Sequence, residues 1–339
     1  MNAASAAPPE RRPPSNPVNR VQRMYKRSRL RRFIRRRKDA TTYHLARFAL
    51  WLPRQISLTR AMAAADCFGD LLYFALPETR RLALAHLEIA FGDSLDVSAR
   101  EEIARAALRN AARCFVELAK FDEIGPQFDA YTSVEGWQHL EAVRDLGRGA
   151  IVITGHIGNW ELLGGYFARK GVPIAAMARP LNDPRLNQLL VDFRTSNGVH
   201  SIMRESSTSS RDMLRILNRR GVLAMLIDQD MITPSVSVPF FGRPARTAVA
   251  PAVLAVRRDL PVVPCFAERR PEGGQRFMIM PPIFPSHSGD RTRDIVEITR
   301  RATHALEERI RANPAEWAWW TKRWRRPPVA RLDLDGEIQ

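Results

Sequence analysis

The sequence contains little cysteine. Its 339 residues include only Cys67, Cys114 and Cys265, and their spacings match no paired metal-binding or disulfide motif. This scarcity argues against a disulfide framework or a zinc site, and it fits a reducing compartment. The patterns Gly-x-Ser-x-Gly and Gly-x4-Gly-Lys are also absent, which argues against a serine-hydrolase elbow and a phosphate-binding loop.

Long apolar runs are absent as well. A spanning helix needs about 18 consecutive apolar residues, and the sequence has no such run. The basic leader is followed by no apolar stretch with a small-residue cleavage site, so no signal peptide is expected. Residues 43–76 come closest to an apolar segment, but charged residues interrupt them, among them Arg47 and Asp66. This mixture predicts either an interfacial helix pair on a membrane or an amphipathic pair packed on the protein's own core.

Acidic residues are scarce at the amino-terminal end. Residues 1–38 hold 13 Lys/Arg and one acid, so +12 of the net +17 lies there. The segment has too little apolar surface to fold alone, and residues 1–40 are predicted to be a disordered basic tail. It can be a solvated tail, an arm on nucleic acid, or a segment attracted to an anionic membrane surface, where each basic residue adds about 1 kcal/mol. Nucleic acid is not an expected partner, because no base-reading module follows.

A histidine follows a short apolar run in the middle of the chain. Residues 150–154 predict a buried strand, His156 lies in the turn that follows, and Glu161 lies in the first turn of the next helix. Carboxyl ends of strands collect catalytic groups in α/β sheets. An imidazole held by a carboxylate is a competent general base, so His156 and Glu161 are the predicted catalytic pair. Backbone N–H groups of Ile157 and Gly158 are candidates for binding an oxyanion. The similar spacing of His200 and Glu205 lacks this context and is interpreted as accidental.

Strands and helices alternate from residue 149 onward. Predicted strands are 149–155, 173–178, 199–203, 221–228, 261–268 and 275–281. Predicted helices are 159–170, 184–196, 208–220, 247–257 and 291–312, and residues 79–121 also have a helical pattern. The alternation predicts an α/β sheet covered by helices on its faces. The expected organisation is a tail over 1–40, a helical layer with interfacial membrane helices over 41–125, an α/β core over 126–328, and a second tail over 329–339.

Three further motifs leave alternatives open. Asp228 and Asp230 end an apolar run, and they can form a metal site of a glycosyltransferase, cap a turn, or lie beside His156 and orient it. The loop containing Phe240, Phe241 and Gly242 can be core or the wall of an acyl-chain groove. The spacing of Trp317, Trp320 and Trp324 places three indoles on one helical face, for packing or for an interfacial aromatic belt.

The order of these motifs resembles that of the bacterial lipid A biosynthesis acyltransferases. The resemblance rests on Gly-His-Ile-Gly-Asn-Trp-Glu-Leu at 155–162, Arg179-Pro180, Asp228-Gln229-Asp230, the 238–242 motif, and Pro314-Ala-Glu-Trp-Ala-Trp319, and it covers roughly residues 43–328. It implies a mixed α/β sheet of the glycerolipid acyltransferase type. It also implies an enzyme of lipid A and lipopolysaccharide biosynthesis at the cytoplasmic face of the bacterial inner membrane, peripheral or monotopic. Phosphatidylinositol mannoside acyltransferases, whose motif usually ends in Asp where this chain has Glu161, are the alternative within the superfamily, together with lysophospholipid acyltransferases.

The resemblance also implies a reaction and its partners. An acyl carrier protein or acyl-CoA thioester would donate a fatty acyl group to a hydroxyl of a membrane glycolipid, with no cofactor and no metal. His156 would accept the hydroxyl proton and Glu161 would fix its tautomer. Arg179 and Arg194 are candidates for phosphate binding, because guanidinium binds phosphate through two parallel hydrogen bonds. The other substrate-binding candidates are Asp228, Asp230, Phe240, Phe241 and Gly242. A metal-dependent glycosyltransferase using Asp228 and Asp230 is the rival enzyme, and a basic scaffold on membrane or nucleic acid is the rival without catalysis.

Overall fold

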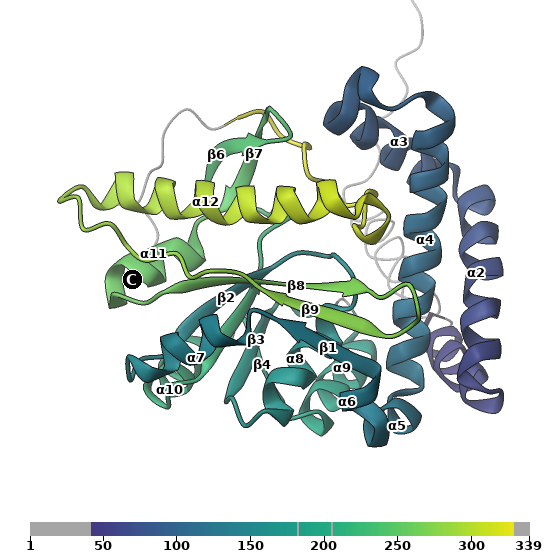
Figure 1. Ribbon diagram of the computed structural model, residues 1–339, viewed down its shortest axis with the longest axis horizontal. Coiled ribbons are helices and arrows are strands. Elements are labelled where there is room, and N and C mark those ends of the chain that lie inside the picture. The colour runs from purple at the N-terminus through teal and green to yellow at the C-terminus, as the bar shows by residue number, and fades with distance from the viewer. Residues whose placement is uncertain (1–41, 182, 205, 329–339) are drawn as a thin grey trace, which may run out of the picture. The chain divides into compact units, whose positions relative to one another are not determined.

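The computed structural model describes residues 42–181, 183–204 and 206–328. The chain divides into two compact units, Met1–Phe48 and Ala49–Gln339. Residues 42–51 are helical, and the strands and the other helices of the described ranges belong to the second unit (Figure 1). The tails predicted over 1–40 and 329–339 lie outside the described residues. Within the ranges that are described, no helix combines the length and the apolar composition needed to cross a bilayer.

A seven-stranded mixed sheet forms the centre of the described part of this unit. Its order is β1-β9-β8-β2-β5-β3-β4, with β8, β2, β5, β3 and β4 parallel to one another and β9 antiparallel to β8. The strands are β1 (Thr132–Glu135), β2 (Ala150–Thr154), β3 (Ile174–Ala178), β4 (Val199–Met203), β5 (Val222–Leu226), β8 (Val262–Arg269) and β9 (Gln275–Ile279). Strand β2 is buried along its whole length, as expected for a strand covered on both faces. The predicted α/β class with a mixed sheet flanked by helices is confirmed.

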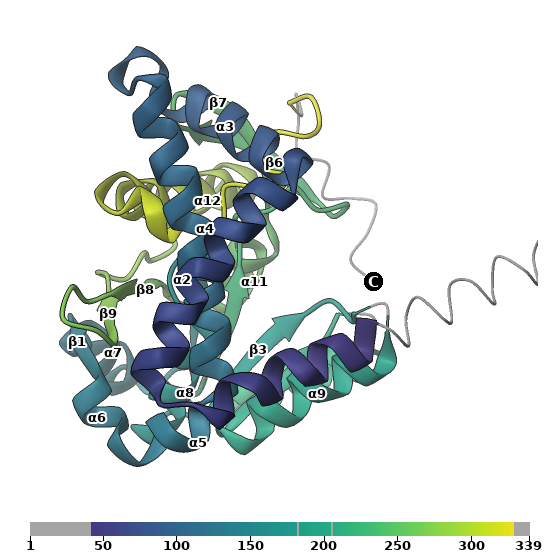
Figure 2. The ribbon, with the colours of Figure 1, turned by 90° about the vertical axis from the view of Figure 1, so that its right-hand side faces the viewer.

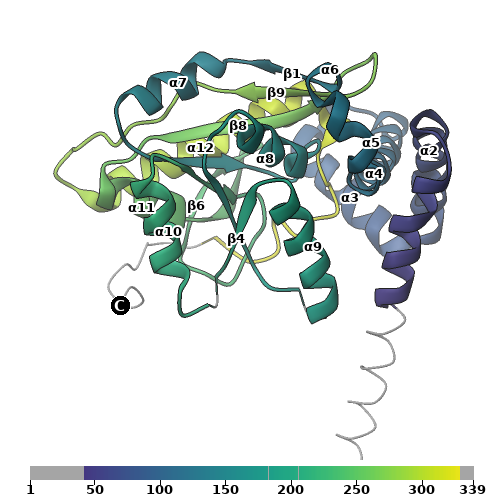
Figure 3. The same ribbon diagram turned by 90° about the horizontal axis from the view of Figure 1, so that it is seen from below.

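Helices cover both faces of the sheet. Ile151 and Ile153 of β2 pack in the cluster that includes α11 and α12, whereas Val152 packs in the cluster that includes α7 and α8. This division follows from the alternation of side chains along a strand. Figures 1 and 3 show α12 and α8 on opposite sides of the sheet. These helices are α7 (Trp137–Asp145), α8 (Trp160–Arg169), α9 (Pro184–Ser196), α10 (Ser209–Asn218), α11 (Ala250–Arg258) and α12 (Arg291–Ala312).

A helical layer precedes the sheet in the chain. It contains η1 (Leu52–Gln55), α2 (Leu58–Ala75), α3 (Pro77–Phe91), η2 (Gly92–Ser94), α4 (Val97–Ala119), α5 (Phe121–Ile124), η3 (Gly125–Gln127) and α6 (Phe128–Tyr131). Helix α2 lies along α4 (Figure 2), with Ala61 and Ala65 buried against Ala112 and Val116. Arg105 and Arg109 of α4 bind Asp70 of α2, and their hydrogen bonds hold the pKa of that carboxyl well below its usual range.

A β-hairpin occupies a segment for which the sequence predicted no strand. Strands β6 (Ser235–Phe240) and β7 (Arg243–Ala248) pair antiparallel through a two-residue turn. Phe241 and Gly242 form that turn with φ of +52° and +71°, the left-handed backbone that tight hairpins require. Val236, Val238 and Phe240 are buried. This two-residue period is typical of a strand, whereas the sequence predicted a loop at Phe240, Phe241 and Gly242.

The segment after α12 is not the helix that the tryptophan spacing predicted. A single 3-10 turn, η4 (Pro314–Glu316), ends in an extended residue, Trp317, which bridges antiparallel to Ile157. Trp317 and Trp319 are fully buried, with their ring centroids 4.7 Å apart. The helical face predicted for Trp317, Trp320 and Trp324 is therefore wrong, because pairing with the loop after β2 replaces helix formation. Trp317 lies in the core and Trp320 and Trp324 pack against it, so packing is the alternative that fits.

Candidate active site

His156 lies in a loop that is fixed on several sides. The loop joins β2 to α8, and its backbone receives a hydrogen bond from Ala318 N to His156 O at 3.0 Å. Gly158 N donates to Glu316 O at 3.1 Å. Gly158 has φ of +55°, and a Cβ there would lie 2.1 Å from Ala267 O, so only glycine fits. The Asn159 side chain caps α8 by accepting from Leu162 N.

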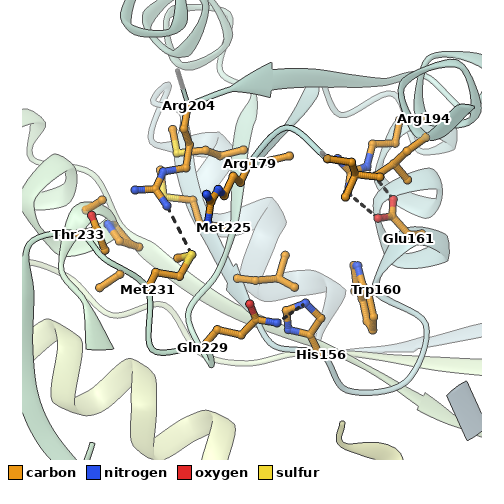
Figure 4. A pocket seen from close by; sticks show the side chains of 18 residues that line it. His156, Trp160, Glu161, Arg179, Arg194, Arg204, Met225, Gln229, Met231 and Thr233 are labelled. Atoms are coloured by element: carbon orange, nitrogen blue, oxygen red, sulfur yellow. Dashed lines mark hydrogen bonds and ion pairs between the residues drawn. The ribbon is translucent and has the colours of Figure 1, made fainter. Parts of the chain in front are cut away.

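The imidazole of His156 is held by a carboxylate from the neighbouring strand. His156 Nδ1 lies 2.8 Å from Asp228 Oδ1, and the His156 backbone N donates to Asp228 Oδ2 at 2.6 Å. Asp228 follows β5, which pairs directly with β2, so both residues lie at the carboxyl edge of the sheet. The Nδ1–H donates to the carboxylate, which leaves Nε2 as the basic nitrogen. In Figure 4 the amide of Gln229 faces this nitrogen, 3.2 Å away.

The pair is electrostatically coupled. Burial lowers the pKa of His156, but the charge and hydrogen bond of Asp228, with a smaller contribution from the charge of Glu161, raise it above its ordinary value. Burial raises the pKa of Asp228, but the charge of His156 and the hydrogen bonds from His156 and Trp317 bring it below its usual range. The carboxylate is therefore ionised and orients the imidazole, as in an Asp–His catalytic pair.

Glu161 does not contact His156 as the sequence predicted. Its carboxylate accepts two hydrogen bonds from Arg194, at 2.5 Å from Nη2 and 2.9 Å from Nε, and both side chains are about nine-tenths buried. The prediction that Glu161 fixes the tautomer of His156 is therefore wrong. Helix α9 brings Arg194 onto that carboxylate instead (Figure 4). The charge of Arg194, which the sequence offered as a phosphate-binding candidate, is therefore already paired with Glu161. Its Nη1 has no hydrogen-bond partner among the described residues.

A pocket of about 370 Å³ opens beside the imidazole (Figure 4). Its wall is largely apolar and includes Met177, Leu190, Met225 and Leu226. Three arginines line it as well. Arg194 is paired with Glu161, whereas Arg179 directly follows β3 and Arg204 directly follows β4. Parallel strands therefore present, in spatial order, His156, Asp228, Arg179 and Arg204 along one edge. This combination of a base, an apolar wall and cations suits a substrate with an apolar chain and an anionic group.

Asp230 and the aromatic loop lie outside this pocket. Asp230 is bound by Arg326, with Nε 2.9 Å from Oδ2, and its side chain is almost fully buried. Phe240 and Phe241 belong to the hydrophobic core, and Gly242 turns the hairpin. None of these four predicted substrate-binding residues lines the pocket beside His156, and each is used in packing, pairing or the turn.

The structure also bears on the predicted oxyanion donors and on the alternative of a metal site at Asp228 and Asp230. The Gly158 N–H is occupied by Glu316, so it is not an oxyanion donor, whereas Ile157 stays a candidate. Asp228 and Asp230 have separate protein partners and do not face a shared site. No group of three or more His, Cys, Asp or Glu side chains that could hold a metal occurs in the described part of the chain. Of the three interpretations of Asp228, orientation of His156 is the one that fits.

Three residues that contribute to the site were not among the predicted site residues. Arg204 and Gln229 come at or just after strand ends, so the rule that placed His156 there would have found them. Trp317 donates from Nε1 to Asp228 Oδ2 at 2.9 Å. No periodicity reveals that bond, because Trp317 lies 89 residues away in the chain.

The comparison with protein families identifies the class. Residues 33–326 match the model of the bacterial lipid A biosynthesis acyltransferases, and the chain belongs to this family. The Mycobacterium tuberculosis phosphatidylinositol mannoside acyltransferase is 29% identical over 197 residues, which cover 56% of this chain and 59% of that protein. The Mycolicibacterium smegmatis protein of the same name is 27% identical over 239 residues, covering 66% and 73%. The chain thus matches about three fifths of the length of the M. tuberculosis relative.

A solved structure is also similar. The 1-acyl-sn-glycerophosphate acyltransferase of Thermotoga maritima aligns with a TM-score of 0.33 and 16% sequence identity, over 73% of this chain and 98% of that one.

Proposed function

We propose that this protein is an O-acyltransferase that moves a fatty acyl group from a thioester to a sugar hydroxyl of a membrane glycolipid. The observation that carries the proposal is the His156–Asp228 pair at the mouth of an apolar pocket that also contains Arg179 and Arg204. Family membership supports acyl transfer, and the pocket supports an apolar chain together with an anionic group. An acyl carrier protein or coenzyme A would supply the thioester.

The reaction needs one proton acceptor. The acceptor hydroxyl replaces the Gln229 amide at Nε2 and gives its proton to His156 as its oxygen attacks the thioester carbonyl carbon. Asp228 stabilises the imidazolium that forms. The carbon–sulfur bond then breaks, and the leaving thiolate takes the proton from His156, which restores the base. The Ile157 N–H is the proposed donor to the oxyanion.

The cations lie away from the reacting atoms. Neighbouring strands are about 4.8 Å apart, so the end of β3 is about 10 Å from His156 and the end of β4 about 14 Å. We propose that a phosphate bound by Arg179 lies apart from the hydroxyl that is acylated, because β5 separates β3 from β2. Both acceptors suggested by the comparisons, a lipid A precursor and a phosphatidylinositol mannoside, carry phosphate and sugar hydroxyls.

We further propose attachment to the cytoplasmic face of the bacterial inner membrane, at its anionic surface. Helix α2 exposes Phe68, Leu71 and Phe74 at 53%, 59% and 61% of their surface, on a helix whose small residues pack on α4. Such a face suits insertion at the boundary between headgroups and acyl chains.

The test is a transfer assay with purified protein in lipid vesicles. Acyl carrier protein and coenzyme A, each carrying a radiolabelled fatty acyl group as a thioester, are offered separately with a lipid A precursor or a phosphatidylinositol mannoside. Mass spectrometry of the product should show one added acyl ester on the sugar. No ester with any donor–acceptor combination, under conditions in which the protein is folded, would refute acyl transfer. Labelled product with only one acceptor would decide between the two glycolipids.

A further inference from the structure

The carboxylate of Asp228 is held by three N–H groups and is fully buried. Its Oδ1 faces His156 Nδ1 at 2.8 Å. Its Oδ2 accepts from the His156 backbone at 2.6 Å and from the Trp317 indole at 2.9 Å. Two of the three donors belong to the residue that the carboxylate orients, and the third comes from the segment after α12.

We propose that Trp317 is a positioning residue for the acyl transfer: its indole N–H fixes the Asp228 carboxylate so that Oδ1 faces the imidazole, and it limits how strongly that carboxylate binds the proton on His156. This inference rests on the proposed function. Trp317 touches neither substrate nor the reacting atoms, and it acts only through Asp228.

The surroundings of Trp317 suit this role. The side chain is 1% exposed, and the rings of Phe240 and Trp319 pack against it at 5.7 Å and 4.7 Å. A buried indole needs an acceptor for its single N–H, and a buried carboxylate needs donors. The same stretch of chain also binds the His156 loop, through Ala318 N and the Ile157–Trp317 bridge. Base and carboxylate thus share one rigid support.

Few other charged groups act on this pair. The charge of Glu161 on α8 acts on His156, and the buried Arg323 guanidinium interacts with both Asp228 and Asp230. Arg323 donates to Arg246 O and to the Thr247 hydroxyl, not to Asp228. Replacing the indole of Trp317 removes no charge from this set, so a change in the titration of His156 does not arise from a lost charge.

Loss of the indole N–H should raise the pKa of His156. A carboxylate that loses one of its donors becomes more basic and binds the Nδ1–H of the imidazolium more strongly. The pKa of His156 then rises further. Because the base works only when neutral, activity at neutral pH falls and recovers at alkaline pH. A rise of about 0.5 corresponds to about a threefold smaller neutral fraction below the pKa.

Trp319 provides a matched control. It is equally buried, and its Nε1 donates to Pro314 O at 2.7 Å rather than to a carboxylate. The experiment compares Trp317→Phe with Trp319→Phe in full-length protein and measures kcat/KM between about pH 5.5 and about pH 9.5. We expect the acid limb to move to higher pH by about 0.5 for Trp317→Phe only, since only that variant loses a donor to Asp228. Trp319→Phe should lower the profile evenly or leave it unchanged.

A second readout does not depend on catalysis. The His156 resonance in protein labelled with ¹³C-histidine, identified by its loss in His156→Gln, gives the imidazole titration directly. If Trp317→Phe does not fold, 3-benzothienylalanine at position 317 keeps the ring shape and replaces the N–H by sulfur. The proposal would be overturned if Trp317→Phe had the acid limb and the His156 titration of the wild type. It would also be overturned if kcat/KM of this variant were lower by the same factor at every pH. A wild-type protein without transferase activity would refute the proposed function, while the titration would still test the role of Trp317.

Discussion

His156 has its two ring nitrogens in different surroundings, one on a carboxylate and one facing the pocket. We predict that His156→Ala lowers kcat/KM about 100- to 10,000-fold, the usual effect of losing a general base. Circular dichroism should show an unchanged fold. His200→Ala is the matched control, because that histidine lies exposed on β4, outside the pocket. Near-normal turnover in a folded His156→Ala protein would refute the mechanism.

Asp228→Asn tests which carboxylate orients the base. Asparagine has no charge, and its amide can present N–H to Nδ1 and so favour the wrong tautomer. We predict a loss of kcat/KM of about 100- to 10,000-fold. The pKa of His156 should fall, because the main group that raises it is removed, so any residual activity extends to lower pH. Full activity in this variant would contradict the pairing with Asp228.

Glu161 should act differently, through Arg194. Glu161→Ala leaves a buried guanidinium unpaired, which typically costs about 3–5 kcal/mol of unfolding free energy, and it should abolish most transfer by disturbing the pocket wall. The double variant Glu161→Leu/Arg194→Met removes both charges and should recover much of the stability. Denaturant unfolding of the three proteins is the measurement. If Glu161→Ala is as stable as wild type, the ion pair is not a structural element of the pocket.

These residues show where inference from the sequence succeeds and where it stops. His156, Arg179 and Asp228 were placed at strand ends because buried strands and their termini are local patterns. The partner of Glu161 depends on how α9 packs, and the bond of Trp317 depends on a segment far along the chain. Neither is encoded by spacing. The tryptophan spacing even favoured a helix, which the bridge to Ile157 overrides.

At the scale of elements, α2 is amphipathic in an unusual way, with small residues inside and large apolar ones outside. We predict that Phe68→Gln/Leu71→Gln/Phe74→Gln weakens binding to neutral vesicles at least about tenfold, since each side chain buried in lipid contributes up to about 1.5–3 kcal/mol. Glutamine is a good helix former, so α2 should persist. Leu146→Gln, also half exposed but located after α7, is the control. Vesicle sedimentation gives both values, and unchanged binding of the triple variant would contradict insertion of α2.

Strong periodicity made most elements predictable. The helices over 184–196 and 291–312 match α9 and α12 at both ends, because a capping aspartate precedes each and an apolar stripe continues through it. The four-residue strand β1 is too short to give a pattern. The β6–β7 hairpin was missed because Phe241 takes a left-handed backbone that glycine or asparagine normally occupies.

For the whole molecule, the uneven charge matters most. Residues 1–38 carry +12, and their attraction to anionic lipid decays over about 8 Å at physiological salt, whereas apolar insertion is not screened. We predict that deleting residues 1–38 weakens binding to anionic vesicles at low salt and has little effect at high salt or on neutral vesicles. Sedimentation at two salt concentrations tests this. Equal binding by both proteins to anionic vesicles at low salt would show that the basic segment does not contribute.

The hydrogen bond between Trp317 and Asp228 can form only late in translation. Translation delivers His156 and Asp228 first and Trp317 89 residues after Asp228, which takes about 4–20 s at usual elongation rates of about 5–20 residues per second. During that interval the nascent chain can form the β2–β5 pair, but its carboxylate lacks the indole donor. Completion of the hydrogen bonds around the base is thus among the last events, after the helices of the amino-terminal half have left the ribosome.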